Sequence, residues 1–482
     1  MEVKLRGHEF EYDITGMCLL FFPGESVRFV SRVKEEIWLS SRLIRNENGL
    51  FAKATFQNKA ESYRCQKKIF DQTKEGLLAA VKYTVYQVFH RATGICPPWG
   101  ILTGIKPTGI YRRILDEKGP AATRQFLLNE YCMQPEKIPL LHQICKVMET
   151  VKTDPDKEAS LYISIPFCPS RCTYCSFISV AAEKSHRLID TYLELLLNEI
   201  KEKCAVLKKH ALKIKSVYIG GGTPGILNAE QLERLLQKVV DELDEPLAEF
   251  TFELGRPDTV TEEKLYLLKK YGVTRVCINT QTTNDRILET VGRKHTRAQY
   301  FDAVSLTRSL NFDSINTDLI AGLPGEDEIS FAQSLEDVLK AGADNVTIHT
   351  LSIKRSSKLH DSDQYFDPSN DHVQRMLDKA YQRLLSLGYV PYYMYRQKNT
   401  VSNGENIGFS KPETIGLYNP YMMEDLHPVA ACGAGASSKL IFSPNGRIER
   451  IINVKYPYEY INENERIQKN TILLDQKLEE RI

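Results

Sequence analysis

Short apolar runs alternate with longer amphipathic segments from about residue 160 onward, and polar loops separate them. The apolar runs are rich in β-branched and aromatic residues: Leu161–Ile165, Ser216–Ile219, Glu249–Leu254, Arg275–Thr280, Ser314–Ile320 and Asn345–Leu351. The clearest amphipathic segment runs from about Lys184 to Lys208 and carries its apolar side chains on one stripe. Repeated alternation of strand, loop and helix is typical of parallel βα units. The pattern therefore predicts six such units in an α/β fold, arranged as an open, partial (β/α)6 barrel.

The chain before this region has a mixed pattern. Two runs predict short strands, Ser26–Val33 and Glu36–Ile44, and a helix follows from about Lys74 to Arg91. That helix has one apolar face and stops at Gly94. The polar residues 152–159 are typical of a linker. We therefore predict an N-terminal α+β domain over residues 1–155.

The chain after the βα units returns to a mixed pattern. A helix is predicted from about Asp371 to Leu387. Three later runs predict short strands that can pair as a small sheet: Pro391–Tyr395, Ala436–Phe442 and Arg447–Asn453. We therefore expect the barrel to cover residues 156–357, and a C-terminal α+β extension over residues 358–482 to cover the substrate.

Composition narrows the class of protein. With 482 residues and 42% hydrophobic side chains, the chain can fill two or three cores. Its 63 basic and 62 acidic residues nearly balance, so nothing predicts nucleic acid or an anionic membrane as partner. The N-terminus carries charged side chains from its second residue, and no stretch reaches the roughly 18 to 20 apolar residues of a membrane span. The eleven cysteines are scattered, which favours a reducing compartment, the cytoplasm.

Three of these cysteines lie close together, in Cys168-Pro-Ser-Arg-Cys172-Thr-Tyr-Cys175. Thiolates are soft ligands that bind iron–sulfur clusters, zinc or copper(I). Three of them can hold three corners of a four-iron cluster and leave the fourth iron open for chemistry. No fourth ligand follows at matching spacing, since Phe177 stands two places on. From the triplet alone, a zinc site completed by His186 is the alternative.

Polar residues also follow the other predicted strands. Gly220-Gly-Gly-Thr-Pro224 follows the second, Glu253 ends the third, Gln281 ends the fourth, and Asp318 lies near the end of the fifth. In parallel βα barrels the functional groups cluster at these carboxyl ends. Glycines let the backbone approach a ligand closely, and Thr223 adds a hydroxyl; a tight turn is the alternative.

Two carboxylates stand out by their surroundings. Glu253 alternates with Phe250 and Phe252, so it lies on the opposite face from the aromatic side chains. If that face is the barrel interior, the acid is buried and needs a cationic or hydrogen-bonding partner; otherwise it is a surface residue. Asp318 lies inside an apolar strand, where an unpaired charge is costly. Arg293 can grip a carboxylate with two parallel hydrogen bonds.

Several of these motifs together resemble the radical S-adenosylmethionine family. They are Tyr162-Ile-Ser-Ile-Pro-Phe-Cys168 through Cys175-Ser-Phe, Gly-Gly-Gly-Thr-Pro, and Asp318-Leu-Ile-Ala-Gly-Leu-Pro-Gly. Their order and spacing resemble the oxygen-independent coproporphyrinogen III oxidases, also called coproporphyrinogen dehydrogenases. The leading domain, with Pro-Pro-Trp-Gly-Ile-Leu-Thr-Gly at 97–104, is similar to the HemZ-like subgroup.

The resemblance implies a radical-SAM barrel in which Cys168, Cys172 and Cys175 hold a [4Fe–4S] cluster whose free iron binds S-adenosylmethionine. It implies that a 5'-deoxyadenosyl radical converts two propionates of coproporphyrinogen III to vinyl groups, giving protoporphyrinogen IX in haem synthesis. A low-potential, flavodoxin- or ferredoxin-like electron donor is expected as partner. The residues at the family's cofactor-binding positions are Tyr162, Tyr174, Gly221, Gly222, Thr223, Glu253, Gln281, Arg293 and Asp318. No catalytic side chain is assigned beyond cluster and cofactor.

The substrate of such an enzyme carries four carboxylates, so its site should offer several cations. The candidates near predicted strand ends or loops are Lys354, Arg355, Arg396, Lys398 and Lys411. Solvated surface charges are the alternative for each of them.

The sequence also departs from the well-studied relatives. Phe177 stands where they carry an additional cysteine that is not a cluster ligand, and Ser164 stands where they have a histidine. Related haem-binding chaperones carry a His-Asn-x-x-Tyr-Trp-type motif, whereas this chain has Ile415-Gly-Leu-Tyr-Asn-Pro-Tyr421. A haem-binding or haem-delivery protein without decarboxylase activity is one alternative function. Radical chemistry on another tetrapyrrole is a second.

Overall fold

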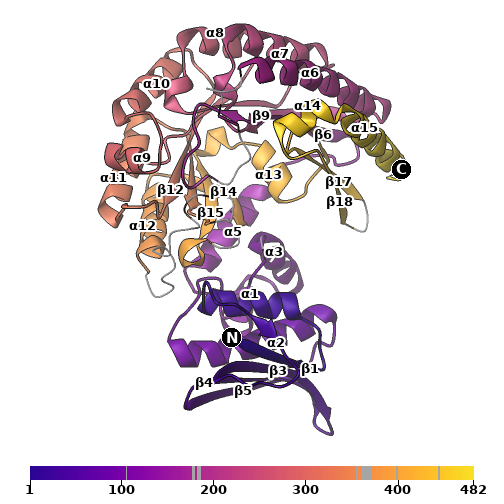
Figure 1. Ribbon diagram of the computed structural model, residues 1–482, viewed down its shortest axis with the longest axis vertical. Helices are drawn as coiled ribbons and strands as arrows, with labels where there is room; N and C mark the ends of the chain where they lie inside the picture. The colour runs from indigo at the N-terminus through magenta and orange to yellow at the C-terminus, as the bar shows by residue number, and fades with distance from the viewer. Residues whose placement is uncertain are drawn as a thin grey trace. The chain divides into compact units, whose positions relative to one another are not determined.

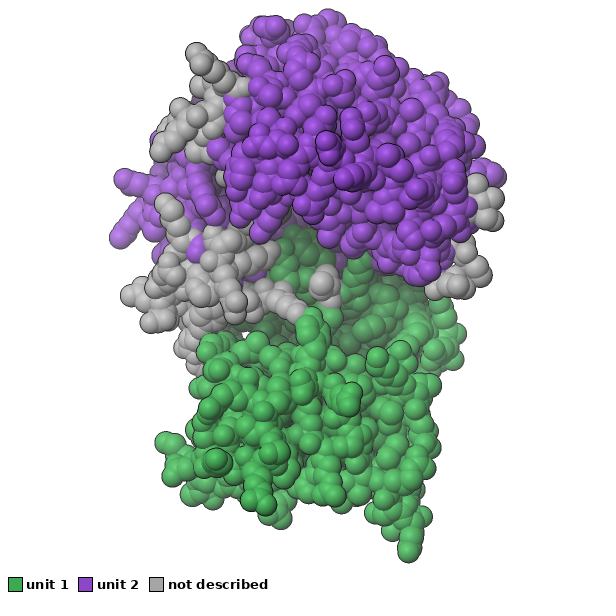
Figure 2. All heavy atoms as spheres, turned by 45° about the vertical axis from the view of Figure 1, so that its right-hand side comes forward, with its two compact units in different colours: residues 1–145, 362–374, 395–405 green, residues 146–361, 375–394, 406–482 purple. Residues whose placement is uncertain are grey.

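The computed structural model describes residues 1–104, 106–175, 180–181, 186–353, 357, 359, 371–397, 400–442 and 446–481. The chain forms two compact units (Figure 2). The first contains Met1–Cys145 with the later segments Ser362–Gln374 and Tyr395–Glu405, and the second contains the rest. Among the described residues, no helix combines the length and the apolar character needed to cross a membrane.

The first unit is built on a five-stranded sheet with the order β2-β1-β3-β4-β5 (Figure 1). Its strands are β1 (Glu2–Arg6), β2 (Arg28–Phe29), β3 (Ile37–Asn46), β4 (Gly49–Asn58) and β5 (Glu61–Ile69). Its helices are α1 (Glu11–Phe21), α2 (Lys74–Thr93), α3 (Pro107–Lys118), α4 (Pro120–Glu130) and α5 (Lys137–Met148), the last of which runs into the second unit. The predicted strands and helix are present, but β2 is shorter than expected.

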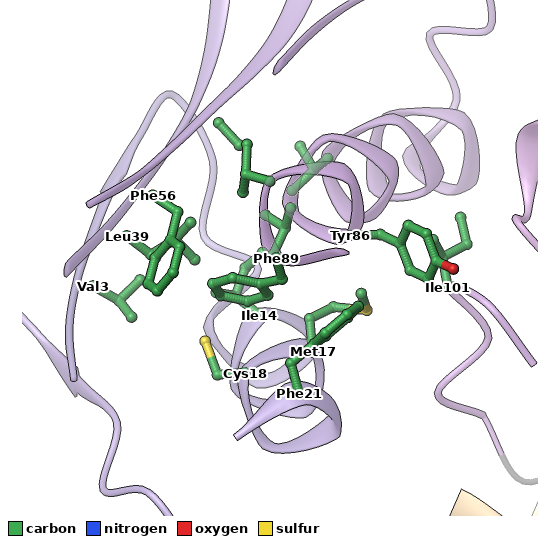
Figure 3. Close-up of a cluster of buried hydrophobic side chains, with 14 of the residues drawn as sticks. Val3, Ile14, Met17, Cys18, Phe21, Leu39, Phe56, Tyr86, Phe89 and Ile101 are labelled. Atoms are coloured by element: carbon green, nitrogen blue, oxygen red, sulfur yellow. The ribbon is translucent and has the colours of Figure 1, made fainter. Parts of the chain in front are cut away.

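Aliphatic and aromatic side chains from two helices and the sheet fill the core of this unit (Figure 3). Phe89 of α2 makes edge contacts with Phe56 of β4 and tilted contacts with Phe21 of α1. Helix α2 begins where the side chain of Thr73 accepts a hydrogen bond from the backbone N–H of Gly76. It ends at Gly94, whose φ of 73° is the left-handed conformation typical of glycine at helix ends. These two caps set the ends of α2, the helix that places Phe89 in the core.

The second unit contains the six predicted βα units. Their strands are β6 (Glu158–Ile165), β9 (Lys213–Gly221), β10 (Glu249–Gly255), β11 (Arg275–Ile278), β12 (Ser314–Ala321) and β13 (Asn345–Thr350). They pair in this order, and every pair is parallel. The helices that follow are α6 (His186–Lys209), α7 (Ala229–Asp241), α8 (Glu262–Lys270), α9 (Asp285–Thr290), α10 (Arg297–Ser309) and α11 (Glu328–Ala341). Figure 1 shows α6 to α11 on the outside of the strands, so the partial barrel is confirmed.

Further strands extend this sheet at both ends to eleven. At one end lie β16 (Val429–Cys432), β17 (Ser437–Phe442) and β18 (Arg447–Ile452), with β16 parallel to β6. At the other lie β15 (Glu405–Ser410), antiparallel to β13, and β14 (Val390–Arg396). Strands β17 and β18 pair with each other as predicted, whereas the prediction that β14 joins them in one small sheet is wrong, because β14 lies at the opposite edge. Strand patterns specify an extended backbone but not its partner, and here the barrel's two open edges provide the partners.

Further elements complete the described chain. The remaining strands are β7 (Phe167–Cys168) and β8 (Val180–Ala181), which pair with each other. The remaining α-helices are α12 (His372–Ser386), α13 (Tyr418–Met423), α14 (Pro457–Asn462) and α15 (Asn464–Glu479). Single 3-10 turns occur at Pro224–Ile226, Pro257–Thr259, Val401–Asn403 and Pro412–Thr414.

Candidate functional site

The three clustered cysteines lie on the loop that leaves β6. Cys172 is buried, Cys168 and Cys175 are partly buried, and all three are free thiols. The backbone N–H of Cys175 donates to the carbonyl oxygen of Cys172 at 3.2 Å, which closes a tight turn. The N–H of Thr173 donates to the carbonyl of Val291 at 3.0 Å, so the loop is attached to the segment before α10. The three thiols therefore share one anchored loop.

An arginine from the end of β10 holds the same loop from another side. Arg256 is 3% exposed and donates to the hydroxyl of Ser170 at 2.6 Å. Its other nitrogens donate to both carboxylate oxygens of Asp258 at 2.8 and 2.7 Å. Sequence reasoning missed this residue, because an arginine after a strand carries no pattern that separates it from a surface charge.

The glycine run packs directly against the chain that leads into Cys168. The N–H of Gly222 donates to the carbonyl of Ile165 at 2.8 Å, and that of Thr223 donates to Phe167 at 2.7 Å. A Cβ on Gly222 would lie 2.6 Å from the carbonyl oxygen of Phe167, and Gly221 has a φ of +113°. Both positions therefore require glycine. The prediction that the run lets a ligand approach stays a prediction; here the close neighbour is the protein's own backbone.

One side chain connects this run with the cysteine loop. The hydroxyl of Thr223 donates a hydrogen bond to the sulfur of Cys168, with 3.3 Å between Oγ1 and Sγ. Thr223 is 4% exposed. The loops after β6 and β9 are thus joined at the position of the first thiol.

Glu253 lies inside the barrel, not on its surface. It is partly buried, and it accepts hydrogen bonds from the hydroxyl of Tyr218 and from the backbone N–H of Gly221. Burial, with a smaller contribution from the nearby Asp318, raises the pKa of Glu253 to about 7, although the two hydrogen bonds partly oppose this rise. Near neutral pH this carboxyl is therefore poised between its neutral and charged forms.

Three tyrosines form a stack beside this carboxyl. The ring of Tyr218 lies 4.6 Å from that of Tyr418 and 6.1 Å from that of Tyr162, measured between centroids. Their planes differ by 28° and 24°, which is a stacked arrangement. Tyr162 was predicted, whereas Tyr218 and Tyr418 were missed. Tyr218 alternates with Val217 and Ile219 as Glu253 does with its phenylalanines, so the same period could have revealed it.

Asp318 has the partners that its position in an apolar strand demands. Asn316 donates to one of its carboxylate oxygens at 2.9 Å, and the other lies 3.5 Å from Nε2 of His349 on β13. Its backbone carbonyl accepts from the N–H of Gln281 at 2.9 Å. Sequence reasoning missed His349. Nothing in the sequence of β13 indicates that this histidine faces Asp318 on the neighbouring strand β12.

Gln281 is conformationally strained. Its φ of 70° lies in the left-handed region, which is uncommon outside glycine, and its buried Oε1 atom has no hydrogen-bond partner. A buried amide oxygen without a partner is costly and marks a place where a ligand's donor would fit.

Arg293 lies between the cysteine loop and β11. Its guanidinium donates to the hydroxyl of Tyr174 at 3.0 Å and to the backbone carbonyl of Asn279, while its buried Nε atom has no partner. The arginine is 8% exposed. Tyr174 on the cysteine loop and Arg293, both predicted from the sequence, are therefore in direct contact.

Two of the five predicted substrate-binding cations, Lys411 and Arg396, lie among the described residues, and each has partners within the protein. Lys411 forms an ion pair with Asp344 at 2.9 Å, next to the amino end of β13 and away from the carboxyl strand ends. Arg396 belongs to the first unit, where it is 6% exposed, donates to the carbonyl of Leu102 and lies over the ring of Trp99. Lys354, Arg355 and Lys398 lie outside the described residues, as does Phe177.

The residues present fit a four-iron cluster with a polar organic cofactor beside it. Three thiols on one loop provide soft ligands for iron, and the buried groups of Gln281, Arg293 and Glu253 offer acceptors and a donor. Among the described residues, the one set of three ligand atoms within 4.8 Å of one another is His210, Asp475 and Glu479.

Comparisons with known proteins agree with this fit. Residues 162–338 match the model of the Radical SAM superfamily. The chain is 36% identical over 415 residues to the oxygen-independent coproporphyrinogen-III oxidase-like protein HemZ of Bacillus subtilis, covering 84% of this chain and 81% of that protein. It is 29% identical over 320 residues to the heme chaperone HemW of Lactococcus lactis, covering 66% and 79%. The solved coproporphyrinogen III oxidase HemN of Escherichia coli has a similar fold, with a TM-score of 0.50 and 22% identity over 66% of this chain and 72% of that one.

Proposed function

We propose a function from one premise: this chain belongs to the radical S-adenosylmethionine superfamily, and within it to the family of oxygen-independent coproporphyrinogen-III oxidase-like proteins. A [4Fe–4S] cluster and S-adenosylmethionine are the cofactors of this superfamily. The proposed reaction is the oxidative decarboxylation, without oxygen, of two propionates of coproporphyrinogen III to vinyl groups. Its product is protoporphyrinogen IX.

One observation supports this reaction more than any other. The similarity to the HemZ protein covers 415 residues, far more than the 162–338 segment that matches the superfamily model. It therefore includes much of the chain outside the barrel core. A shared substrate class explains similarity in such regions better than shared cofactor chemistry does.

Cluster binding is assigned to Cys168, Cys172 and Cys175. Thr173 and the pair of Arg256 with Ser170 hold their loop in place, so the thiols meet the cluster on a rigid support. When bound, the cluster and S-adenosylmethionine would supply a 5'-deoxyadenosyl radical that takes a hydrogen atom from the β-carbon of a propionate. Loss of carbon dioxide and transfer of one further electron to a one-electron acceptor would then leave the vinyl group. The electron for each cleavage comes from a low-potential, flavodoxin- or ferredoxin-like donor.

Cofactor binding is assigned to the polar residues at the strand ends. Glu253 and Asp318 offer carboxylates to hydroxyl or ammonium groups, Gln281 offers its unpartnered amide oxygen, and Arg293 its unpartnered Nε–H. Gly221, Gly222 and Thr223 form the wall beside them, and Tyr174 fixes Arg293. The stack with Tyr162 provides an apolar surface that keeps water from the radical.

A haem-binding chaperone of the same family is the second candidate, because the chain is 29% identical to the heme chaperone HemW of Lactococcus lactis. One local feature argues against it. The segment Ile415–Tyr421 lacks a histidine, and its Tyr418 stacks on Tyr218. Radical chemistry on another tetrapyrrole would use the same cluster and cofactor.

The test is an anaerobic assay of the full chain after cluster reconstitution. With dithionite and S-adenosylmethionine, we expect coproporphyrinogen III to increase 5'-deoxyadenosine and to yield protoporphyrinogen IX together with it. Cys172→Ala should abolish both products, whereas Cys204→Ala, a buried cysteine on α6, should keep them. Two results together would overturn the decarboxylase in favour of the chaperone. They are slow deoxyadenosine formation at a rate that coproporphyrinogen III does not change, and stoichiometric haem binding.

A further inference from the structure

We propose that Thr223 sets the reduction potential of the cluster through its hydrogen bond to Cys168. The inference rests on the proposed function, because it needs Cys168 to be a cluster ligand. Its content is separate: Thr223 was predicted to contact S-adenosylmethionine, whereas the contact present is to a thiol sulfur at 3.3 Å. A hydroxyl has one hydrogen to donate, and here that hydrogen goes to sulfur.

The backbone around Thr223 leaves its hydroxyl little freedom. The N–H of Thr223 donates to Phe167 at 2.7 Å, and its carbonyl accepts from Ile226 at 2.9 Å. Pro224 follows directly and disfavours the helical conformation at Thr223. The φ and ψ of Thr223 are −146° and 85°. Because threonine is branched at Cβ, few side-chain rotamers remain. The O–H is thus held toward Cys168 by the main chain.

Neighbouring glycines bring this backbone close enough for the contact. A Cβ on Gly255 would lie 3.0 Å from the methyl carbon of Thr223, and one on Gly225 would lie 2.4 Å from the carbonyl oxygen of Leu254. The 3-10 turn at Pro224–Ile226 therefore sits directly on the end of β10. The methyl group is packed on one side, which leaves the hydroxyl on the side of the sulfur.

A hydrogen bond to a cluster thiolate changes the energy of the two redox states unequally. Reduction transfers one electron from the reductant to the cluster. No bond is formed or broken, and the sulfurs become more negative. A donor at sulfur stabilises the reduced state more than the oxidised one, so it makes the potential less negative. The change in potential is larger at a buried site, because no water molecule replaces the hydroxyl when it is removed. Thr223 would therefore make the cluster easier for a weak biological reductant to reduce.

The experiment measures the cluster's potential, not turnover. Wild type, Thr223→Val, Thr223→Ser and Thr307→Val are reconstituted and titrated with dithionite by EPR, without S-adenosylmethionine. Thr307 is a matched control, because it is also fully buried and its hydroxyl donates to the carbonyl of Ala303 in α10. We expect a more negative potential in Thr223→Val, and values equal to wild type in Thr223→Ser and Thr307→Val.

The outcomes separate the two proposals. An unchanged potential in Thr223→Val with a full cluster overturns this inference and leaves the proposed function intact. An intact cluster in Cys168→Ala, or none in wild type, overturns the ligand assignment instead. If Thr223→Val does not fold, pulsed EPR in D2O decides: an exchangeable deuteron coupled to the cluster is expected in wild type and Thr223→Ser and lost in Thr223→Ala. Equal coupling in Thr223→Ala would refute the proposal.

Discussion

The phenol of Tyr218 on β9 donates a hydrogen bond to the carboxylate of Glu253 on the neighbouring strand β10. The two groups share a mostly buried interior, and burial raises the pKa of both. The pKa of Glu253 reaches about 7, whereas that of Tyr218 moves away from neutrality. Glu253 is therefore the member of the pair whose charge changes near physiological pH.

We expect S-adenosylmethionine to bind more tightly as the pH rises from 6 to 8. The cofactor is cationic and should prefer the charged form of Glu253. Because the pKa of this carboxyl is about 7, Glu253 is mostly protonated and neutral at pH 6. Below that pKa the affinity should rise by up to about tenfold per pH unit. Calorimetric titration of the reconstituted protein at pH 6, 7 and 8 measures this.

The matched variant is Glu253→Gln, which keeps a hydrogen-bond acceptor for Tyr218. It should bind the cofactor about tenfold more weakly at pH 8 and show a much flatter pH profile, since it loses a charge-assisted bond. Identical profiles in wild type and variant would remove Glu253 from the cofactor site.

A second buried carboxyl should make the protein's stability depend on pH. Burial raises the pKa of Glu326 to about 8; Thr282 donates to its Oε1 at 3.0 Å, and its Oε2 has no partner. Because its pKa is higher in the folded than in the unfolded state, the folded state holds the extra proton. Stability is therefore full below about pH 4.5 and is lost as the pH rises toward 8.

Glu326→Gln removes this charge and keeps the bond from Thr282. We expect the variant to be more stable than wild type by about 1 to 3 kcal/mol at pH 8, and equal to it near pH 5. Urea unfolding of the cluster-free protein at both pH values is the measurement. A variant that is less stable at both would show that Glu326 is charged in the folded state.

Arg293→Lys should loosen the cysteine loop. A lysine cannot donate to Tyr174 and to the carbonyl of Asn279 at once, so one of the two links is lost. We expect iron to leave the reconstituted cluster several-fold faster in the presence of a chelator. Arg297→Lys is the control, because Arg297 is half exposed and pairs with Asp337. Equal rates in both variants would mean that Arg293 does not support the loop.

Glu199 on α6 should be among the most sensitive positions for stability. Its carboxylate is 2% exposed, forms an ion pair with Lys203 at 2.8 Å, and accepts from the N–H of Gly433 at 2.7 Å and the hydroxyl of Tyr460 at 2.6 Å. Glu199→Ala leaves a buried lysine unpaired and should cost about 3 to 5 kcal/mol. Glu194→Ala, on the same helix, breaks an exposed ion pair with Arg234 of α7 and should cost at most about 1 kcal/mol. Thermal unfolding compares the two.

The sequence predicts what depends on local pattern. The six parallel strands follow from apolar runs, and the cysteine loop follows from spacing, whereas the contacts between Tyr174 and Arg293 and between Thr223 and Cys168 appear only in the structure. The positive φ of Gln281 and the role of Arg256 have no such pattern, because each depends on residues from distant strands. The same limit explains the error over β14, which pairs at the opposite edge of the sheet from β17 and β18. Local sequence determines whether a segment is extended, but the strand it pairs with depends on which sheet edge is unpaired.

Strand β6, which carries the cysteine loop, has β9 on one side and β16 on the other. The hydroxyl of Ser164 on β6 donates to the carbonyl of Ala434, a residue 270 positions later in the chain. At about 5 to 20 residues per second, a ribosome needs tens of seconds to make that stretch. Through all of this time the thiols stand beside an unpaired strand edge. Strand β6 gains its second neighbour only when about nine-tenths of the chain has been made, so we expect the cluster to be inserted after translation and not during it.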